Sequence, residues 1–320
     1  MALCAARSRA KSPPTMRILF VTSTRIGDAV LSTGLLDHLI RTHPDARVTV
    51  ACGPVAEGVF ARMPNREKTI VLVKKRLSAH WLGLWAEVAR TRWDLVVDLR
   101  GSALAWLVPA RRRAVMQGGR RAGHRIGHIA ETLGLPRPPP PVAWFAPAVA
   151  ARAAALLPGE GPFLALGPSA NWSGKVWPPE RFVELFRALT APGGPLPGAR
   201  AVVLAGPGAQ EAAMVAPVLA ALPEALDLTG RLELPEVAAV MARCALFVGN
   251  DSGLMHLAAA AGTPTLGLFG PTPASEYGPI GRAARAVLAR GTPGAAPMAA
   301  LPVEDALAAA QGLLAAEPVA

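Results

Sequence analysis

Four residues in one short stretch have the types and spacing of a site for an anionic ligand, namely Asp251, Ser252, Gly253 and His256. An apolar, strand-like run, Ala245 to Val248, precedes them, and a small-residue segment, Leu254 to Ala261, is expected to continue as a helix. The first N–H groups of such a helix have no helical partner and point at whatever lies above the end of the strand. Because the helix dipole favours negative charge there, the stretch predicts a phosphate site.

The side chains of this stretch have different expected roles. Ser252 is a good helix N-cap, Gly253 lets a ligand approach the backbone closely, and His256 lies one turn further on, on the face that looks back at a bound anion. A carboxylate repels phosphate, so Asp251 is expected to accept hydrogen bonds from backbone N–H groups or sugar hydroxyls. The simpler alternative is a plain helix cap followed by a histidine that is satisfied in the core or at the surface.

A second candidate for anion binding is Lys175, in the loop GPSANWSGKVWPPERF (167–182). The loop follows an apolar run, 162–168, that is expected to be a strand. A lone lysine on such a loop can reach into a cleft between domains and neutralise a phosphate. The alternative is a solvated lysine beside a packed Trp177.

A carboxylate stands in a similar place in the first half of the chain. Residues 17–22 have the pattern of a buried strand, and apolar positions at helical spacing predict a helix from about Asp28 to Thr42. Asp28 therefore lies at a helix start above a strand end. On these grounds alone it is a cap or a partner of the helix dipole.

Basic residues gather between positions 111 and 125, at Arg111, Arg112, Arg113, Arg120, Arg121, His124 and Arg125. A solvated basic loop explains any single member. As a group facing a cleft they would grip an anionic acceptor, because the guanidinium fork matches carboxylate and phosphate. The acceptor-binding candidates are Arg120, Arg121 and Arg125, joined by Arg100 at the end of an expected strand.

Strand-like and helix-like segments alternate along both halves of the chain, which favours parallel sheets covered on both faces. We expect an α/β protein with two Rossmann-like domains in tandem and a cleft between them. The first is residues 16–148, ending in a proline-rich extended linker (136–148), and the second is 149–320, ending in a helix over 302–315. The GxGxxG fingerprint is absent after the first strand, which argues against a nicotinamide enzyme.

Composition limits the class of partner. The chain has 320 residues, and its 33 Lys and Arg against 22 Asp and Glu give a net charge of +11. Such a balance suits a phosphorylated substrate, an acidic membrane surface or a nucleic acid. Three widely spaced cysteines fit no metal or disulfide pattern and favour a reducing cytoplasm. Residues 1–15 lack the apolar core of a signal peptide and are expected to be a disordered leader, with Met16 as an alternative start.

Several blocks together resemble glycosyltransferase family 9, the ADP-heptose:lipopolysaccharide heptosyltransferases, which have the GT-B fold. The blocks are TSTRIGDAVLSTGLL, DLVVDLRGS, SANWSGKVWPPERF, AVVLAGPGAQE, LDLTGRLELPEVAAVMARCALFVGNDSGLMHLAAAAGTPTLGLFGPT and YGP. They agree with the family in order and spacing from Met16 to about Gly281. This resemblance is far more specific than any one motif.

The resemblance implies roles for individual residues. Asp28 matches the family's proposed general base, and Lys175 matches the lysine on the nucleotide-sugar diphosphate. The block that holds the diphosphate and donor sugar is matched by Asp251, Ser252, Gly253 and His256, and Asn171 is expected among the donor contacts. Family members often carry hydroxyl residues near Ala170 and Asn171, and many have an acidic residue where this chain has Pro273, so its donor contacts differ in detail.

The resemblance also implies a reaction. The family is inverting and needs no metal for catalysis, and no Asp-x-Asp pair occurs in this chain. The expected activity is transfer of a heptose or related sugar from an ADP-sugar to a lipopolysaccharide core or other surface-glycan acceptor, with no cofactor. The expected partners are the nucleotide-sugar donor and an anionic glycolipid, with peripheral contact at the cytoplasmic face of the inner membrane as a further hypothesis and no nucleic acid. In this fold a C-terminal helix often crosses back to the first domain, as is expected of 302–315.

Two other classes stay open at the level of sequence. A sugar-nucleotide epimerase or hydrolase of the same architecture would release free sugar or nucleotide without an acceptor. A non-catalytic protein that binds nucleotide sugar or nucleic acid would show salt-sensitive binding and indifference to Asp28→Ala.

Overall fold

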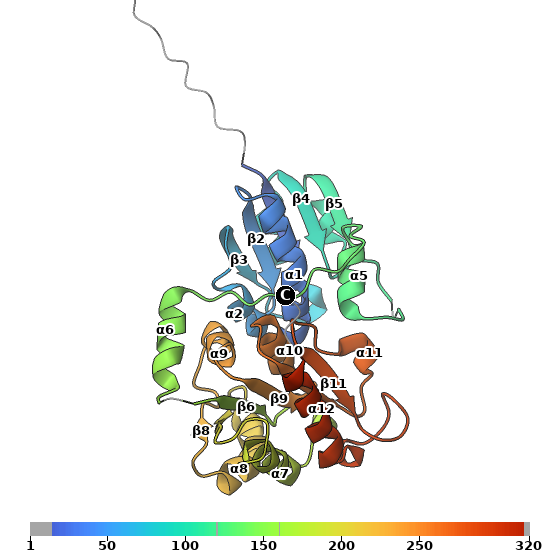
Figure 1. The fold of residues 1–320 in the computed structure, drawn as a ribbon. Coiled ribbons are helices and arrows are strands. Elements are labelled where there is room, and N and C mark those ends of the chain that lie inside the picture. Colours follow the sequence, from blue (N-terminus) through green and yellow to red (C-terminus); the bar gives the residue numbers. More distant parts are fainter. Residues whose placement is uncertain (1–14, 120, 160, 317–320) are drawn as a thin grey trace, which may run out of the picture.

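The computed structural model describes residues 15–119, 121–159 and 161–316, and in these ranges the chain forms two α/β domains (Figure 1). The N-terminal domain lies at the top of Figure 1 and the C-terminal domain at the bottom. The expected pair of Rossmann-like domains in tandem is confirmed. The predicted leader, residues 1–15, lies outside the described residues except for Thr15.

The elements of the N-terminal domain are β1 (Arg17–Val21), α1 (Ile26–Thr42), β2 (Arg47–Cys52), α2 (Glu57–Phe60), β3 (Arg66–Val71), α3 (His80–Val88), β4 (Trp93–Asp98), α4 (Leu104–Leu107), β5 (Ala110–Val115) and α5 (Arg125–Glu131). Those that follow are α6 (Pro147–Leu156), β6 (Phe163–Gly167), α7 (Pro179–Thr190), β7 (Arg200–Val203), α8 (Ala209–Ala221), β8 (Leu226–Asp227), α9 (Leu234–Met241), β9 (Leu246–Asn250), α10 (Gly253–Ala260), β10 (Thr265–Phe269), α11 (Ala274–Tyr277), β11 (Ala284–Leu288) and α12 (Val303–Ala315).

Both sheets are parallel at every strand pair in the described ranges. The strand order is β3-β2-β1-β4-β5 in the N-terminal sheet and β11-β10-β9-β6-β7-β8 in the C-terminal sheet. Every residue of β6, β9 and β10 is buried, because helices cover both faces of the sheet. These strands are therefore continuous apolar runs rather than alternating ones.

The strand order changes direction between β1 and β4 in one sheet and between β6 and β9 in the other. In doubly wound sheets, ligands bind outside the carboxyl ends of the strands at such switch points. The loop after β1 leads to Asp28, the loop after β6 carries Lys175, and the turn after β9 carries Asp251. The topology thus puts the three charged candidates at ligand-binding positions.

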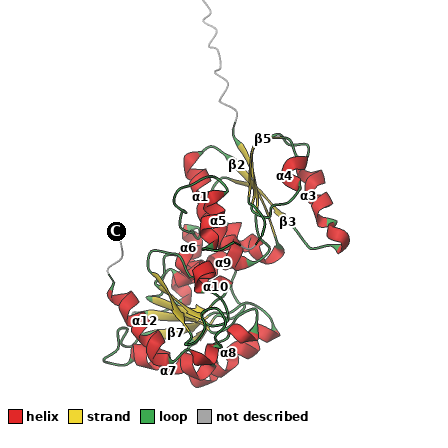
Figure 2. Ribbon diagram, turned by 90° about the vertical axis from the view of Figure 1, so that its right-hand side faces the viewer, coloured by secondary structure: helices red, strands yellow, loops and turns green. Residues whose placement is uncertain are grey.

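Helices cover each sheet in two layers. In the N-terminal domain α1 and α5 cover one face and α3 and α4 the other (Figure 2). In the C-terminal domain α9 and α10 pack on the face toward the N-terminal domain, whereas α7, α8 and α12 pack on the far face. One hydrophobic cluster includes Phe20 and Leu35 of the first domain and Val240 and Met255 of the second. The core therefore runs from one domain into the other.

The proline-rich run predicted as a linker packs tightly against α1. The backbone of Pro139 and Pro140 lies so close to Gly34 that a Cβ at this glycine would clash with both carbonyl oxygens. Beyond that point, the Val142 N–H donates a hydrogen bond of 2.8 Å to the Thr33 hydroxyl. A glycine in the middle of α1 is thus required by the crossing backbone, not by the helix.

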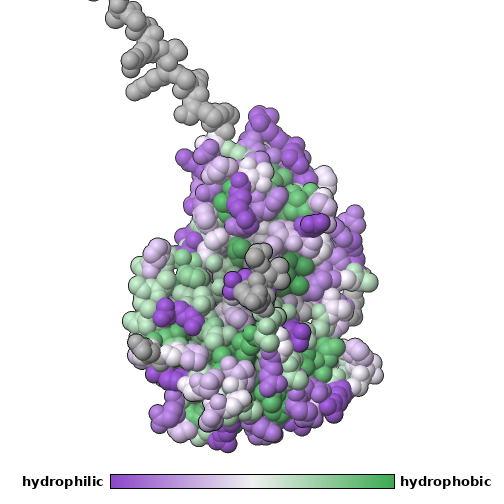
Figure 3. All heavy atoms as spheres, in the orientation of Figure 1, coloured by the Kyte–Doolittle hydropathy of each residue, from purple (hydrophilic) through white to green (hydrophobic). Residues whose placement is uncertain are grey.

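The same segment then reaches the C-terminal domain. The Ala143 N–H donates to the carbonyl of Ala260, the last residue of α10, over 3.0 Å. Next comes α6, which packs on α9 and is held there by a 3.0 Å ion pair between Arg152 and Glu236. The alanines of α6 give a pale green, weakly hydrophobic surface in Figure 3. The segment therefore holds the two domains together as well as connecting them.

Two expectations about the secondary structure are wrong. The basic stretch 111–125 is not a single loop, because Arg111, Arg112 and Arg113 lie on β5 and Arg125 begins α5. Since β5 is the edge strand of its sheet, its outward side chains are solvated and its sequence lacks the apolar run of an inner strand. The terminal helix α12 packs against α7, β10 and β11 and so covers its own domain's sheet instead of crossing back.

No helix within the described ranges has the length and apolar character needed to cross a membrane.

The crossing at Gly34 predicts opposite effects of the same substitution at two helical glycines. Gly34→Ala should lower the free energy of unfolding by about 1–3 kcal/mol, because the new methyl group displaces the crossing backbone. Gly83→Ala, at a site in α3 where a Cβ meets nothing, should raise it by about 0.5–1 kcal/mol through helix propensity. Urea unfolding measures both, and equal stabilisation by the two alanines would contradict this account of the crossing.

Candidate active site

The beginnings of α1 and α10 meet between the domains. A Cβ at Gly27 would lie 3.0 Å from the His256 ring, and a Cβ at Gly253 would lie 2.9 Å from the Ile26 side chain. Glycine at both places allows this approach. Since α1 follows β1 and α10 follows β9, the positive ends of two helix dipoles share one region, and this region suits an anion.

Asp28 lies in the first turn of α1, with its side chain 25% exposed. One carboxylate oxygen is 4.0 Å from Nε of Arg125, at the start of α5, and the other accepts a 3.4 Å hydrogen bond from the Ser23 hydroxyl. Neither contact buries the carboxylate, which stays partly exposed to solvent. Asp28 makes no side-chain cap of α1, so the cap role considered from the sequence is wrong.

Lys175 and Asp251 form an ion pair across the loops after β6 and β9. The ammonium nitrogen lies 2.6 Å from Oδ2 of Asp251, which also accepts a 2.8 Å hydrogen bond from the Thr272 hydroxyl. The side chains are 19% and 8% exposed, so the pair is largely shielded from water. The Asp251 carboxylate thus accepts from a lysine and a threonine hydroxyl and fixes where Lys175 points, whereas acceptance from sugar hydroxyls stays a prediction.

The loop that carries Lys175 is anchored by Trp177. Its backbone N–H donates to the Asn250 side chain over 3.0 Å, and its indole N–H donates to the Leu301 carbonyl over 2.8 Å. The fully buried indole also packs edge-on against Phe182 at 5.1 Å between ring centroids. The packed Trp177 of the alternative is present, but the lysine beside it is paired with Asp251 and only 19% exposed rather than solvated.

His256 is buried beneath this pair. Burial lowers the pKa of His256 to about 4 against the opposing effects of the Asp251 and Asp28 carboxylates, so the imidazole is neutral at pH 7. Within the described chain, its Nδ1 atom and the Ser252 hydroxyl are buried without a hydrogen-bond partner. Ser252 occupies the N-cap position of α10 but makes no side-chain cap bond. A buried polar group without a hydrogen-bond partner is costly, so a ligand that binds at the helix start and pairs with both groups would be favoured.

Two further residues lie close to these groups: His124, which was named from the sequence only within the basic cluster, and Tyr277, which was named only within a sequence block. The His124 ring donates from Nε2 to the Gly278 carbonyl over 2.9 Å, which links α5 to the loop after α11. Its Nδ1 accepts from the Ile126 N–H, and burial lowers its pKa, so the ring is neutral. Burial and then the Asp28 carboxylate raise the pKa of Tyr277, which keeps its phenol protonated. The tripeptide Tyr277-Gly278-Pro279 was the available signal.

The remaining predicted residues are spread more widely. Asn171 is exposed on the Lys175 loop. Of the acceptor candidates, Arg125 lies beside Asp28, Arg121 pairs with Glu131 at 2.6 Å, and the Arg100 guanidinium lies 5.9 Å from the Trp81 ring centroid. Arg120 lies outside the described residues. The structure thus brings Arg125 to the carboxylate but gives Arg100 and Arg121 other partners.

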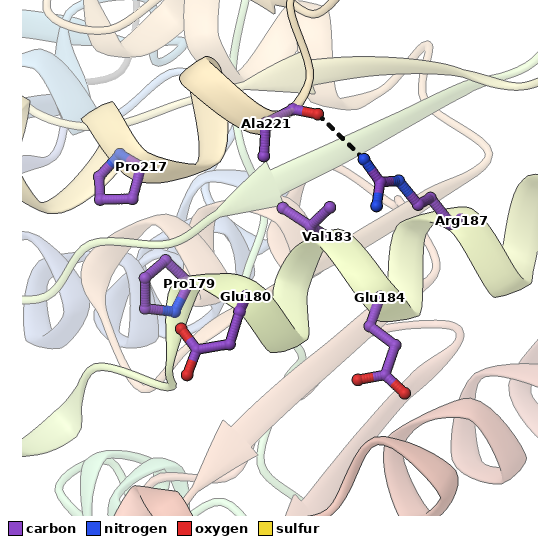
Figure 4. Close-up of a pocket in the computed structure, with 7 residues that line it drawn as sticks. All are labelled: Pro179, Glu180, Val183, Glu184, Arg187, Pro217 and Ala221. Carbon is purple, nitrogen blue, oxygen red and sulfur yellow. Dashed lines mark hydrogen bonds between the residues drawn. The ribbon is translucent and has the colours of Figure 1, made fainter.

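A surface hollow elsewhere does not belong to this site. It lies between α7 and α8 and is lined by Pro179, Glu180, Val183, Glu184, Arg187, Pro217 and Ala221 (Figure 4). The Arg187 guanidinium donates to the Ala221 carbonyl across it over 3.3 Å. None of the residues described above lines it, and it lies on the helices of the far face.

Comparison with known proteins agrees with this geometry. Residues 128–299 match the family model "Glycosyltransferase family 9 (heptosyltransferase)". The lipooligosaccharide heptosyltransferase 2 of Haemophilus influenzae is 26% identical over 306 residues, covering 82% of this chain and 86% of that protein. The solved ADP-heptose lps heptosyltransferase II of Escherichia coli superposes with a TM-score of 0.74 at 21% identity, over 93% of this chain and 98% of that one. The GT-B fold is confirmed.

A metal is present in one more distant structural match. This iron-containing dodecameric glycosyltransferase from enterotoxigenic E. coli has a TM-score of 0.53 at 16% identity, covering 88% of this chain and 64% of its own. In the part of the present chain that the structure describes, no three His, Cys, Asp or Glu side chains gather as ligands for a metal ion.

The family model extends over more than half of the 320 residues and takes in Lys175, Asp251 and His256. This glycosyltransferase belongs to glycosyltransferase family 9, the heptosyltransferase family.

Proposed function

We propose that this protein transfers a heptose or a related sugar from an ADP-sugar to a lipopolysaccharide core or other surface-glycan acceptor, with inversion at the anomeric carbon and without a metal ion. The observation that carries the proposal is the close approach of two helix starts: Gly27, next to Asp28 on α1, lies against the His256 ring of α10, and the turn before α10 carries Asp251 paired with Lys175. The names of the relatives, which describe heptosyltransferases and ADP-heptose, support the choice of sugar and nucleotide.

The donor diphosphate would lie at the start of α10. The free N–H groups of this helix, the Ser252 hydroxyl and the Lys175 ammonium offer it donors and positive charge. Asp251 holds the lysine in place without removing its remaining donors, because an ammonium group has three. As the sugar leaves, the negative charge on the departing ADP is stabilised by these groups in a partly buried site. This arrangement supplies the charge stabilisation that a metal ion provides elsewhere.

Asp28 would act as the general base. It takes the proton of the acceptor hydroxyl as that oxygen forms a bond to the anomeric carbon, while the bond from this carbon to the phosphate oxygen breaks. Attack from the side opposite the leaving ADP inverts the anomeric configuration. Arg125 and Tyr277 lie beside Asp28 and are placed to contact the acceptor. Acceptor binding by Arg100, Arg120 and Arg121 remains part of the proposal.

The assignment of the base predicts a selective loss of turnover in Asp28→Asn. Rates should fall about 10²–10⁴-fold, because general-base help of that size is removed while the donor site in the other domain is untouched. Acceptor-dependent ADP release measures the rate, and calorimetric titration with ADP-sugar should give an unchanged Kd. Asp37→Asn is the matched control, since Asp37 lies on the same helix in an ion pair with Arg41. Half of the normal rate in Asp28→Asn would exclude Asp28 as the base, and sugar release without acceptor would favour a hydrolase.

The donor site predicts weaker binding of ADP by Lys175→Met. The affinity should fall about tenfold to a hundredfold, because a charge-assisted contact to the diphosphate is lost and Asp251 is left with only Thr272. Lys68→Met is the matched control, because Lys68 pairs with Glu87 in the N-terminal domain. An ADP affinity equal to that of Lys68→Met would remove Lys175 from the donor site.

Metal independence predicts that chelation leaves turnover unchanged. Protein dialysed against a chelator and assayed in its presence should transfer sugar at the rate of the untreated protein, because lysine and helix N–H groups supply the positive charge. A loss that one added divalent metal restores would contradict this part of the proposal.

A further inference from the structure

The outer face of the N-terminal domain carries large apolar side chains where polar ones are usual. Leu82 and Trp85 of α3 are 70% and 43% exposed, and Trp106 and Leu107 of α4 are 67% and 63% exposed. The two helices touch here, because the Trp85 indole N–H donates to the Leu107 carbonyl over 3.0 Å. We call these four residues the α3–α4 patch.

The core does not explain the patch. The inward sides of the two helices already bury Leu84, Val88, Leu104 and Ala105 on the sheet. A surface helix normally places charged or polar residues on its other side, and a cluster of exposed large apolar groups marks an interaction site. Figure 2 shows α3 and α4 at the right-hand edge of the N-terminal domain, across its sheet from α1. The patch therefore lies away from the junction with the C-terminal domain.

The tryptophan on α4 is held in place. The Arg113 guanidinium lies 5.7 Å from the Trp106 ring centroid and donates hydrogen bonds to the carbonyls of residues 105, 108 and 110. Arg113 thereby fixes the end of α4 and supports the ring through a cation–π contact. An exposed aromatic ring that is already ordered loses little conformational entropy on binding.

Basic residues surround the patch. Lys74, Lys75 and Arg76 are exposed in the segment that leads into α3, and Arg90 and Arg92 are exposed just after it ends. The acidic neighbours Glu87 and Asp94 are engaged by Lys68 and Arg111. The rim is therefore strongly positive around an apolar centre.

We propose that the α3–α4 patch and its basic rim dock onto an anionic phospholipid bilayer. Tryptophan rings favour the boundary between headgroups and acyl chains, leucines favour the acyl side, and lysine and arginine attract anionic headgroups. A protein partner would have to carry acidic groups that match these lysines and arginines in position, whereas mobile anionic headgroups can gather around them. The inference rests on this face alone and holds whatever sugar the site transfers.

Sedimentation with lipid vesicles tests the proposal. The full-length protein should sediment with vesicles of phosphatidylcholine and phosphatidylglycerol, remain in solution with phosphatidylcholine alone, and dissociate as salt is raised. The double variant Leu82→Ser/Leu107→Ser should bind about tenfold or more weakly, because two apolar contacts with the acyl boundary are lost. Replacing Lys74 and Lys75 by Gln should weaken binding about fivefold per charge.

Leu288→Ser provides the matched control. Leu288 is 44% exposed on β11 in the other domain. Every variant keeps the basic residues near the N-terminus, so differences in vesicle binding between variants come from the substituted positions. All substituted leucines are exposed, and circular dichroism should show an unchanged fold.

Binding that is absent, or equally weakened in Leu288→Ser, would overturn the proposal. A dimer that the double variant abolishes would assign the patch to a second copy of this chain instead. The vesicles contain neither donor nor glycan acceptor, so this outcome is separate from the test of sugar transfer.

Discussion

The close approach of α1 and α10 is the contact on which the site depends. Gly27 and Gly253 leave room for the His256 ring and the Ile26 side chain, and a hydrophobic cluster continues through this contact from one sheet to the other. Because protein interiors are packed to high density, a methyl group added here would displace neighbouring side chains and backbone along the junction. The helix start that carries Asp28 and the one beside the Lys175–Asp251 pair lie together because the backbones come this close.

The charges around the junction balance in pairs. Asp28 lies near Arg125, and Asp251 binds Lys175, so each acid at the site already faces a base. These pairs leave the positive end of α10 uncompensated, and there the buried Ser252 hydroxyl and His256 Nδ1 find no hydrogen-bond partner among the described residues. A neutral His256 adds no charge of its own, since burial lowers its pKa to about 4. The positive potential that suits this region to an anion therefore comes mainly from the backbone of the helix start.

Sequence reasoning was strongest where local pattern and topology coincide. Apolar runs followed by small polar residues identified the strands and the loops after β1, β6 and β9, because buried parallel strands and helix starts have local signatures. It failed where the partner is distant in the chain: the 2.6 Å pair joins residues 175 and 251, and His124 reaches Gly278. The strand β5 and helix α5 were missed because an edge strand with three arginines and a seven-residue helix with a glycine near its start have weak patterns.

The two proposed surfaces assign different tasks to the domains, and the topology permits this. The residues proposed to bind the donor lie on loops of the C-terminal sheet, whereas the α3–α4 patch lies on the face of the N-terminal sheet opposite α1. A bilayer bound at this patch would leave the α1–α10 junction uncovered, because the sheet separates the two. At the same time α4 follows β4, whose carboxyl end lies next to that of β1 and hence near Asp28. An acceptor anchored in that bilayer would need to extend only past the edge of one sheet to reach the carboxylate, while a water-soluble donor enters from the other domain.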